Sequence, residues 1–278
     1  MFSSLDRLVR NALQEDIGQE DVTANSTVPA DARCRVRLLA KQEGVLSGVT
    51  VFRAVMDCAQ ACVSDWGSME AGARFQCGDE LAEFEGNARS VLTAERVALN
   101  FVQRLSGVAT LTARYVAAVK GLPVRICDTR KTTPFIRRQE KEAVIHGGGT
   151  NHRHTLFNGV VIKENHIVAA GGIANAVKMA IEHTHHLMKI EVEVTNLDEF
   201  GQAVAAGADV IMLDNMSLDE MREAAERARG TRLILEASGN MTLDRVRPAA
   251  ETGVHVISVG ALTHSAPAVD ISLLIENL

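Results

Sequence analysis

Basic residues gather in one short stretch of an otherwise acidic chain. The segment at residues 127–134 reads Cys-Asp-Thr-Arg-Lys-Thr-Thr-Pro and follows an apolar run. From Arg125 to Lys163 there are eight basic residues and three acids, whereas the whole chain carries a net charge of −6. Arginine binds planar carboxylates through paired hydrogen bonds, and lysine suits phosphate as a point charge. The sequence therefore predicts a pocket for a multiply anionic molecule.

Polar or small residues also follow the other strand-like runs of this half of the chain. Glu193 and Asp214 end two of them, and carboxylates there suit ribose hydroxyls or an ion such as Mg²⁺. The last two ends are rich in small residues, which free backbone N–H groups to hold a phosphate. These residues are Ser238, Gly239 and Asn240 after one run, and Gly260 and Ala261 after the next. We therefore expect a cationic pocket, a carboxylate pair and a phosphate cradle.

Repeated strand–helix units must position these side chains. Short apolar runs alternate with helical patterns after residue 122, and they occupy residues 124–127, 159–162, 189–194, 209–213, 232–236 and 254–259. Such repeats indicate a parallel sheet, and this many in a row favours a barrel over a doubly wound sheet. No G-x-G-x-x-G motif follows a strand, which also disfavours a dinucleotide-binding fold. In a barrel the functional residues lie at the carboxyl ends of the strands.

The first 110 residues mix element types. Residues 5–13 have helical spacing, with Ser3 or Ser4 as the N-cap. Residues 75–84 contain turn signals and predict a hairpin. A long helix is expected to begin near Thr93 and to be broken by Gly107, with a second helix from Thr110. The predicted fold class is therefore α/β, with a mixed first domain before the barrel.

Composition excludes several classes of protein. A chain of 278 residues with a net charge of −6 lacks the basic face of a general nucleic-acid binder. The chain has no uncharged apolar run long enough to predict a membrane helix. Its first residues lack the apolar core of a signal peptide. The five cysteines are odd in number and form no C-x-x-C pair, which favours reduced thiols in a cytoplasmic protein.

Motifs for other kinds of chemistry are weak or missing. The histidines of His183-Thr-His185-His186 are interpreted as a solvated helix end and not as a metal site. Neither G-x-S-x-G nor H-E-x-x-H occurs, so no nucleophile–base relay is predicted. The expected chemistry is therefore positioning and electrostatic stabilisation.

Taken together and in order, the motifs of this chain resemble the quinolinate phosphoribosyltransferase family. They are Asp-Thr-Arg-Lys-Thr-Thr-Pro (128–134), Gly-Gly-Gly-Thr-Asn-His-Arg (147–153), Ile-Lys-Glu-Asn-His-Ile (162–167), Glu-Val-Glu-Val (191–194), Leu-Asp-Asn-Met (213–216) and Glu-Ala-Ser-Gly (236–239). The N-terminal stretches at 12–18, 21–23 and 95–107 are similar to the same family. The resemblance covers nearly the whole chain.

The resemblance implies a fold, a reaction and an assembly. The implied fold is an N-terminal α/β sandwich over residues 1–110 and an incomplete parallel α/β barrel over 111–265, with the tail 266–278 packing back on the first domain. The implied reaction joins quinolinate to phosphoribosyl pyrophosphate with Mg²⁺, and yields nicotinate mononucleotide, pyrophosphate and CO₂ in NAD biosynthesis. A homodimer, or an assembly of dimers, with shared active sites is implied as well.

The family pattern also assigns roles to residues of this chain. Arg130, His152 and Arg153 would bind quinolinate with Thr129, and Arg104 would reach in from the neighbouring subunit. Lys131 and Lys163 would hold charge between the substrates, while Glu193 and Asp214 would bind the ribose and, indirectly, Mg²⁺. The 5′-phosphate would lie against Ser238, Gly239, Asn240, Gly260 and Ala261. Asp128 is expected to orient the neighbouring cations.

Two departures and three alternatives accompany this interpretation. Phe135 follows Thr-Thr-Pro where the family usually has glycine, and Asn240 replaces another common glycine. The alternatives are a phosphoribosyltransferase-like paralogue of molybdenum metabolism, a non-catalytic anion-binding barrel, and a barrel lyase with Lys163 as a Schiff base. The paralogue lacks the Lys-Glu-Asn-His pattern that this chain has at 163–166. A barrel that had lost its catalytic function should also have lost some of the charged residues, but this chain keeps them.

Overall fold

The computed structural model describes residues 4–278, so Ser3, one of the two expected N-caps, lies outside the described residues. The chain forms two compact units. The first contains the residues up to Ala113 together with Thr133–Gly148 and Ser265–Leu278, and the second contains Arg114–Thr132 and Gly149–His264. Each unit is described by itself.

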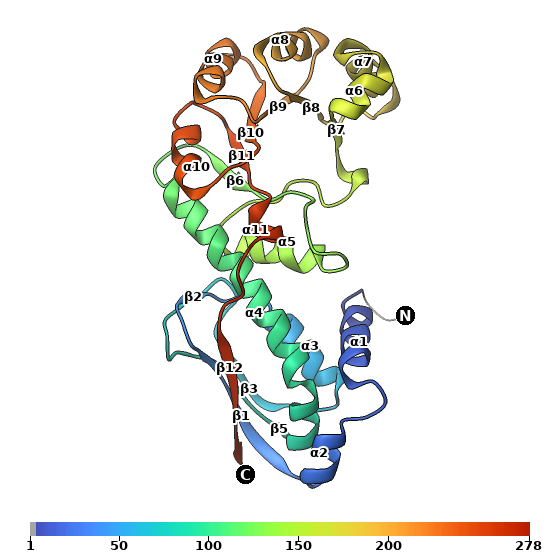
Figure 1. Cartoon of the computed structure of the whole chain (residues 1–278), viewed down its shortest axis with the longest axis vertical. Coiled ribbons are helices and arrows are strands. Elements are labelled where there is room, and N and C mark those ends of the chain that lie inside the picture. Colours follow the sequence, from blue (N-terminus) through green and yellow to red (C-terminus); the bar gives the residue numbers. More distant parts are fainter. Residues whose placement is uncertain (1–3) are drawn as a thin grey trace. The chain divides into compact units, whose positions relative to one another are not determined.

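The first unit is built on a four-stranded antiparallel sheet. Its order is β12-β1-β5-β3, with bounds Ile271–Asn277, Arg33–Ala40, Glu80–Asn87 and Ser64–Ser68. β1 alternates between buried and exposed residues because successive side chains of a strand point to opposite faces. Val36 and Leu38 enter the core, while Arg35 points outward and pairs with Glu85 at 2.9 Å. Figure 1 shows the C-terminal strand β12, in red, beside β1.

The helices of this unit cover the sheet and bury aromatic side chains. They are α1 (Ser4–Ile17), α2 (Val22–Thr27), α3 (Val49–Cys58), the part of α4 (Ala88–Ala118) up to Ala113, and α5 (Arg137–His146). Phe52 of α3 meets Phe84 of β5 edge-on, with ring centroids 6.1 Å apart. Trp66 of β3 lies 5.5 Å from Phe84, so one aromatic cluster joins the helix to the sheet.

Two local predictions for this unit were wrong. The turn at residues 76–79 exists, but β4 (Arg74–Phe75) pairs with β2 (Gly44–Val45), and β5 pairs with β1 and β3, so no hairpin forms. The long helix begins at Ala88 and continues through Gly107 to Ala118. A Cβ at Gly107 would stand 2.0 Å from the carbonyl oxygen of Pro267. Glycine is therefore required there for close backbone approach and does not break the helix.

The second unit is built on a six-stranded parallel sheet. Its order is β6-β11-β10-β9-β8-β7, with bounds Arg125–Cys127, Val256–Ser258, Ile234–Ser238, Val210–Asp214, Ile190–Val194 and Val160–Ile162. All its strands are rich in buried apolar residues, as parallel sheets covered by helices require. Within residues 4–278, the edge strands β6 and β7 do not pair with each other, so the barrel is incomplete. The predicted fold class is confirmed.

Helices connect the parallel strands, and two of them begin at residues whose side chains cap them. The helices are α6 (Glu164–Ala170), α7 (Ile173–His183), α8 (Leu197–Ala206), α9 (Leu218–Ala228), α10 (Leu243–Ala250) and α11 (Ala261–His264), with a short 3-10 turn at Leu156–Asn158. The side chain of Asn196 accepts from two backbone N–H groups at the start of α8, and Ser217 forms a capping box with Glu220 at α9. Figure 1 shows α8 and α9 outside β8 and β9.

The structure places one segment differently from the expected division of the chain. Residues 111–265 were assigned to the barrel, yet Thr133–Gly148, which contains α5, belongs to the first unit. The physical reason lies in α5, where Glu140 is fully buried and binds Arg104 of α4. In the part of the chain that the structure describes, no helix has the length and apolar character needed to cross a membrane.

Candidate active site

A pocket of about 380 Å³ lies at the carboxyl ends of the parallel strands, and its volume is in the range of small-molecule sites. Among the residues that line it are nine that the sequence predicted. These are Thr129, Arg130, Lys131, His152, Arg153, Lys163, Glu193, Asp214 and Ser238. They come from edge strands and interior strands of the same sheet, so the second unit alone brings the cationic stretch and the carboxylate pair together.

Guanidinium groups form the most electropositive wall of the pocket. Arg153 donates from Nη1 to the carbonyl of Gly159 at 2.7 Å, which fixes its direction. Burial, and then the neighbouring Arg130, lower the pKa of the Arg153 guanidinium, whereas Glu191 raises it. Two like charges held this close are unfavourable without an anion, so the wall is prepared for a negatively charged ligand.

The carboxylate pair lines the same pocket as these cations. Glu193 is held by an ion pair with Lys163, and Asp214 accepts a hydrogen bond from Asn215 at 2.9 Å. Both carboxylates lie at the ends of their strands. Glu193 precedes Val194, the last residue of β8, and Asp214 is the last residue of β9. The side chain of Lys163 is 48% exposed, so its ammonium group can leave Glu193 when a substrate enters.

The predicted phosphate cradle is only partly a pocket wall. Ser238 lines the pocket, while Gly239, Asn240, Gly260 and Ala261 are not among the lining residues. Gly239 has φ +84°, and a Cβ there would stand 2.4 Å from Asn215, so only glycine fits. A Cβ at Gly260 would stand 3.1 Å from Lys131 Cδ. Close packing therefore favours glycine at both positions.

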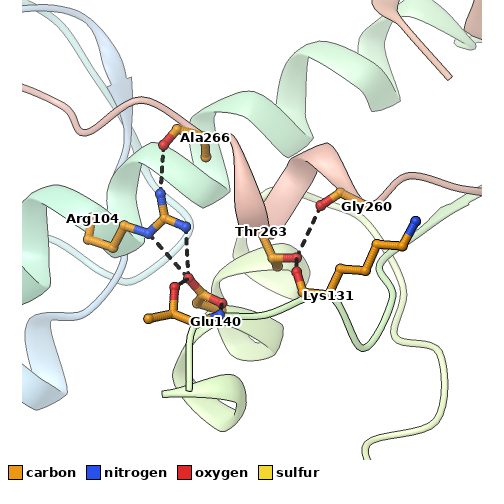
Figure 2. A network of polar contacts seen from close by, with 7 residues as sticks. Arg104, Lys131, Glu140, Gly260, Thr263 and Ala266 are labelled. Carbon is orange, nitrogen blue, oxygen red and sulfur yellow. Dashed lines mark hydrogen bonds and ion pairs between the residues drawn. The ribbon is translucent and has the colours of Figure 1, made fainter. Parts of the chain in front are cut away.

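The last helix of the barrel, α11, holds the backbone at Lys131 in place. Thr263 of α11 donates from its hydroxyl to the carbonyl oxygen of Lys131 at 2.8 Å (Figure 2). The lysine side chain extends away from this contact. Thr263 thereby fixes the main chain at Lys131 without occupying its ammonium group.

Asp128 organises the loop that carries His152. It is fully buried, and its oxygens accept from Asn151 Nδ2 at 2.6 Å and from the backbone N–H of His152 at 2.9 Å. The same loop extends the sheet, because Thr150 forms a parallel bridge with Cys127 of β6. Asp128 therefore acts on the position of this loop, while its expected role in orienting Arg130 and Lys131 stays a prediction.

Arg104 lies in the first unit and is bound by its own chain. Its guanidinium donates to Glu140 Oε1 and to the carbonyl of Ala266, the latter at 2.7 Å (Figure 2). Glu140 also accepts from the backbone N–H and the hydroxyl of Thr133, at 2.9 and 2.8 Å. An arginine that only extends along an apolar helix to keep its charged group in water would have no such partners.

The carboxylates fit an oxygen-loving divalent ion only in part. Glu193 and Asp214 supply oxygen ligands of the kind that Mg²⁺ takes, but two carboxylates leave most of an octahedral shell to water and substrate. Across residues 4–278, the one group of three closely spaced potential ligands is His152, Glu191 and Glu236. His183 is the last residue of α7, and the side chains of His183, His185 and His186 are exposed.

Four residues of the pocket wall received no role from the sequence, although two of them, Glu236 and Ser258, are polar residues at strand ends; the other two are Val161 and Met212. Three of the four precede a predicted site residue by two positions. Val161 precedes Lys163, Met212 precedes Asp214, and Glu236 precedes Ser238. Alternate residues of a strand face the same side, so the period of two could have found them.

A second pocket, of about 710 Å³, is lined mainly by apolar side chains that include Leu156, Phe157 and Met188. It shares Arg153 and Val161 with the first pocket but lacks its lysines and carboxylates. An apolar groove does not suit an anionic ligand, so the smaller pocket is the better candidate for the chemistry.

Comparisons with known proteins decide the family. Residues 21–106 match the quinolinate phosphoribosyl transferase N-terminal domain, and residues 108–274 match the C-terminal domain of the same family. The chain belongs to the quinolinate phosphoribosyltransferase family.

Relatives of this family cover almost the full length of the chain. A "Probable nicotinate-nucleotide pyrophosphorylase [carboxylating]" of Bacillus subtilis is 40% identical over 97% of this chain and 92% of its own length. A chloroplastic nicotinate-nucleotide pyrophosphorylase [carboxylating] of Arabidopsis thaliana is 40% identical over 98% and 83%. The solved nicotinate-nucleotide pyrophosphorylase of Francisella tularensis has a TM-score of 0.92 at 41% identity, over 98% and 96%.

The structure explains two positions where the chain departs from the quinolinate phosphoribosyltransferase pattern. Phe135 has φ 67° and Asn240 has φ 47°, both in the left-handed region that glycine adopts without strain. Asn240 compensates, because asparagine tolerates this region and its Nδ2 donates to Asn215 at 2.9 Å. Phe135 is 95% exposed, and no contact of its ring offsets the strain.

Proposed function

We propose that this protein transfers a phosphoribosyl group from phosphoribosyl pyrophosphate to quinolinate and removes one carboxylate. The products are nicotinate mononucleotide, pyrophosphate and CO₂, as in a step of NAD biosynthesis. The observation that carries the proposal is a single pocket lined both by a guanidinium wall and by the Glu193–Asp214 pair. Membership of the quinolinate phosphoribosyltransferase family supports the same reaction.

Quinolinate is a planar dicarboxylate, and the guanidinium wall would bind it. Arg130 and Arg153 each offer a planar fork of N–H donors that matches a carboxylate. Thr129 lines the same pocket and can donate a neutral hydrogen bond beside them. With both carboxylates held, the ring nitrogen is directed at the sugar carbon that it attacks.

Phosphoribosyl pyrophosphate would lie across the lysines and the carboxylate pair. Glu193 and Asp214 accept from the ribose hydroxyls, and Ser238 with Gly239, Asn240, Gly260 and Ala261 would hold the 5′-phosphate. Lys131 and Lys163 stabilise the negative charge that develops as pyrophosphate leaves. The attacking nitrogen carries no proton, so this step requires no general base.

Decarboxylation follows from the charge of the product ring. Once the nitrogen is alkylated, CO₂ departs and leaves its bonding electron pair on the adjacent ring carbon, where the positively charged nitrogen stabilises it. That carbon then takes a proton from solvent to give the product. The protein has to keep the ring in place, which the arginine wall would do. A magnesium ion bound with the pyrophosphate, held indirectly by Glu193 and Asp214, would supply charge neutralisation.

We further propose a homodimer, or an assembly of dimers, in which Arg104 contributes to the neighbouring subunit's site. Arg104 is the one predicted quinolinate ligand outside the described pocket, which is consistent with a role in another copy of the chain. We also propose a cytoplasmic location, supported by five free cysteines, since disulfides are rare there.

Quinolinate binding tests the site directly. Calorimetry should show saturable binding of quinolinate and at least tenfold weaker binding of nicotinate, because the monocarboxylate leaves one arginine fork unpaired. Arg153→Lys removes the planar fork but keeps the charge, and should reduce that preference. Equal affinity for the two acids would contradict the proposed substrate.

A further inference from the structure

Two buried carboxyl groups lie deep in the barrel, next to the guanidinium wall. Glu191 of β8 and Glu236 of β10 are 6% and 4% exposed. Both face His152, whose Nε2 is 3.1 Å from Glu191 Oε2 and 3.8 Å from Glu236 Oε2. Negative charge at this position opposes the binding of an anion, so a pocket for a dicarboxylate should not keep two such charges without a reason.

The hydrogen bonds of His152 determine which ring nitrogen carries a proton. The backbone N–H of Arg153 donates to Nδ1 at 2.8 Å, so Nδ1 must hold a lone pair. Nε2 therefore carries the proton and donates it to Glu191. A second proton on the ring would point one N–H group at another, so His152 is a neutral imidazole with a single N–H to offer.

One N–H group cannot satisfy two ionised carboxyl groups. The Oε1 atoms of Glu191 and Glu236 are both buried without a hydrogen-bond partner among the described residues. Two carboxylates in this position would repel each other and would each have lost their hydration, and a proton on one of them relieves both penalties. Glu236 is the more distant from the imidazole N–H, so it gains least from being ionised.

The surroundings of Glu236 agree with a protonated group. Burial, and then the charge of Glu191, raise the pKa of Glu236 to about 7, while His152, Ser258 and Lys163 act in the opposite direction. These groups come from β8, from the neighbouring strand β11, from the loop after α5, and from the end of β7. The adjacent strand β9 contributes the uncharged Met212 opposite Glu236.

We propose that Glu236 is a positioning residue that works as an uncharged acid, and that with the Glu191 carboxylate it holds His152 in its neutral Nε2–H form. This inference rests on the proposed function, because it takes the adjoining pocket as the quinolinate site. The trio then carries one negative charge instead of two. Arg130 and Arg153 keep a net positive charge for the dicarboxylate, and His152 contributes a fixed ring and not a third cation.

Glu236→Gln separates the effect of the proton from that of the shape, since the amide resembles the acid but cannot ionise. Calorimetry should give a quinolinate dissociation constant that rises about tenfold from pH 6 to pH 8 in the unmodified protein, as a negative charge appears beside the site. In E236Q the change should be less than twofold. Asp219→Asn, at a 94% exposed carboxylate on α9, is the control and should behave as the unmodified protein. The same pH dependence in E236Q would overturn the proposal.

Infrared spectroscopy locates the proton without any ligand. The unmodified protein at pH 6 should show the C=O band of a buried carboxylic acid, which disappears as the pH rises through about 7 and is absent from E236Q. Absence of that band from the unmodified protein would overturn the proposal even if E236Q failed to fold. A band without quinolinate binding would refute the proposed function while upholding the position of the proton.

A bound metal ion is the competing explanation for the trio, because one atom of each residue lies within 4.8 Å of the others. Zinc would require His152 and both carboxyl groups to be deprotonated. Elemental analysis after dialysis should therefore find no stoichiometric Zn²⁺. Zinc that is retained in the unmodified protein and lost in E236Q would overturn the proposal.

Discussion

Arg104 donates hydrogen bonds from Nε and Nη2 to a single oxygen of Glu140, at 3.2 and 2.9 Å. The guanidinium is 26% exposed and the carboxylate is fully buried, so the pair joins a partly accessible cation to a desolvated anion. Because Glu140 also binds the main chain of Thr133, one side chain orients both Arg104 and the segment before α5.

Removing this carboxylate should destabilise the protein more than removing an ordinary surface acid. Glu140→Ala leaves Arg104 and Thr133 without their partner, and we expect a loss of about 3–5 kcal/mol in unfolding free energy. Glu140→Gln keeps one acceptor and should lose about 1–3 kcal/mol. Urea denaturation measures both, with the exposed Glu142→Gln as the control within about 0.5 kcal/mol. Equal stabilities of E140A and E142Q would contradict the assignment.

Two helical glycines should respond in opposite ways to the same substitution. Gly107→Ala in α4 places a Cβ 2.0 Å from Pro267 O, and relieving this overlap should cost about 2 kcal/mol or more. Gly201→Ala in α8 meets nothing within 4 Å and should stabilise by about 0.5–1 kcal/mol, because alanine favours the helix. Thermal unfolding compares the variants, and stabilisation by Gly107→Ala would show that the close approach is absent.

Relief of backbone strain should make Phe135→Gly more stable than the natural chain. A non-glycine residue in the left-handed region costs about 1–2 kcal/mol, and glycine gives back about 0.5–1 kcal/mol through the entropy of the unfolded chain. The expected net gain is therefore about 0.5–1 kcal/mol in unfolding free energy. Phe135→Ala keeps the strain and loses few contacts, since the ring is 95% exposed, so it should not gain. An equal gain in Phe135→Ala would mean that removal of the aromatic ring, and not relief of backbone strain, stabilises the protein.

Stability should depend on pH through Glu236 in a defined direction. Its pKa is raised from 4.5 to about 7 on folding, so the folded protein holds a proton that the unfolded chain releases. This contribution is fully present below pH 4.5 and is lost as the pH rises through about 7. The difference in unfolding free energy between the natural chain and E236Q should therefore fall by up to about 3 kcal/mol over that range. A difference that is constant with pH would contradict the shift.

Mixing two inactive variants should restore activity if sites are shared between subunits. Arg104→Ala and Lys131→Ala are each expected to lose more than about 100-fold in kcat/KM. A dimer with one copy of each keeps one intact site, so random exchange should recover roughly a quarter of the original activity. Exchange is checked separately with differently tagged copies. No recovery after demonstrated exchange would argue that Arg104 serves its own chain.

The charged lining of the pocket was predictable because it depends on local sequence. Lys163, Glu193 and Asp214 stand at the ends of apolar runs, and a parallel sheet brings such ends together. The period of two along each strand also determines which deeper residues face the same side, as for Val161 and Met212. The fold class followed from the spacing of the same runs.

Other features depend on contacts between segments that lie far apart in the chain. The need for Gly107 comes from Pro267, and the burial of Glu140 comes from Arg104, so neither is visible in a local pattern. His152 was expected to bind quinolinate as one of a set of cations. That role stays a prediction, but the Nδ1 atom of His152 accepts a hydrogen bond from a backbone N–H group of its own loop, which only the folded geometry reveals.

The proposed reaction is tested most directly by the stoichiometry of its products. Purified protein with quinolinate labelled at the 2-carboxylate, phosphoribosyl pyrophosphate and Mg²⁺ should release labelled CO₂ and form nicotinate mononucleotide in a one-to-one ratio. Nicotinate in place of quinolinate should give no product. Turnover of another base, with no CO₂ from quinolinate, would contradict the proposed function.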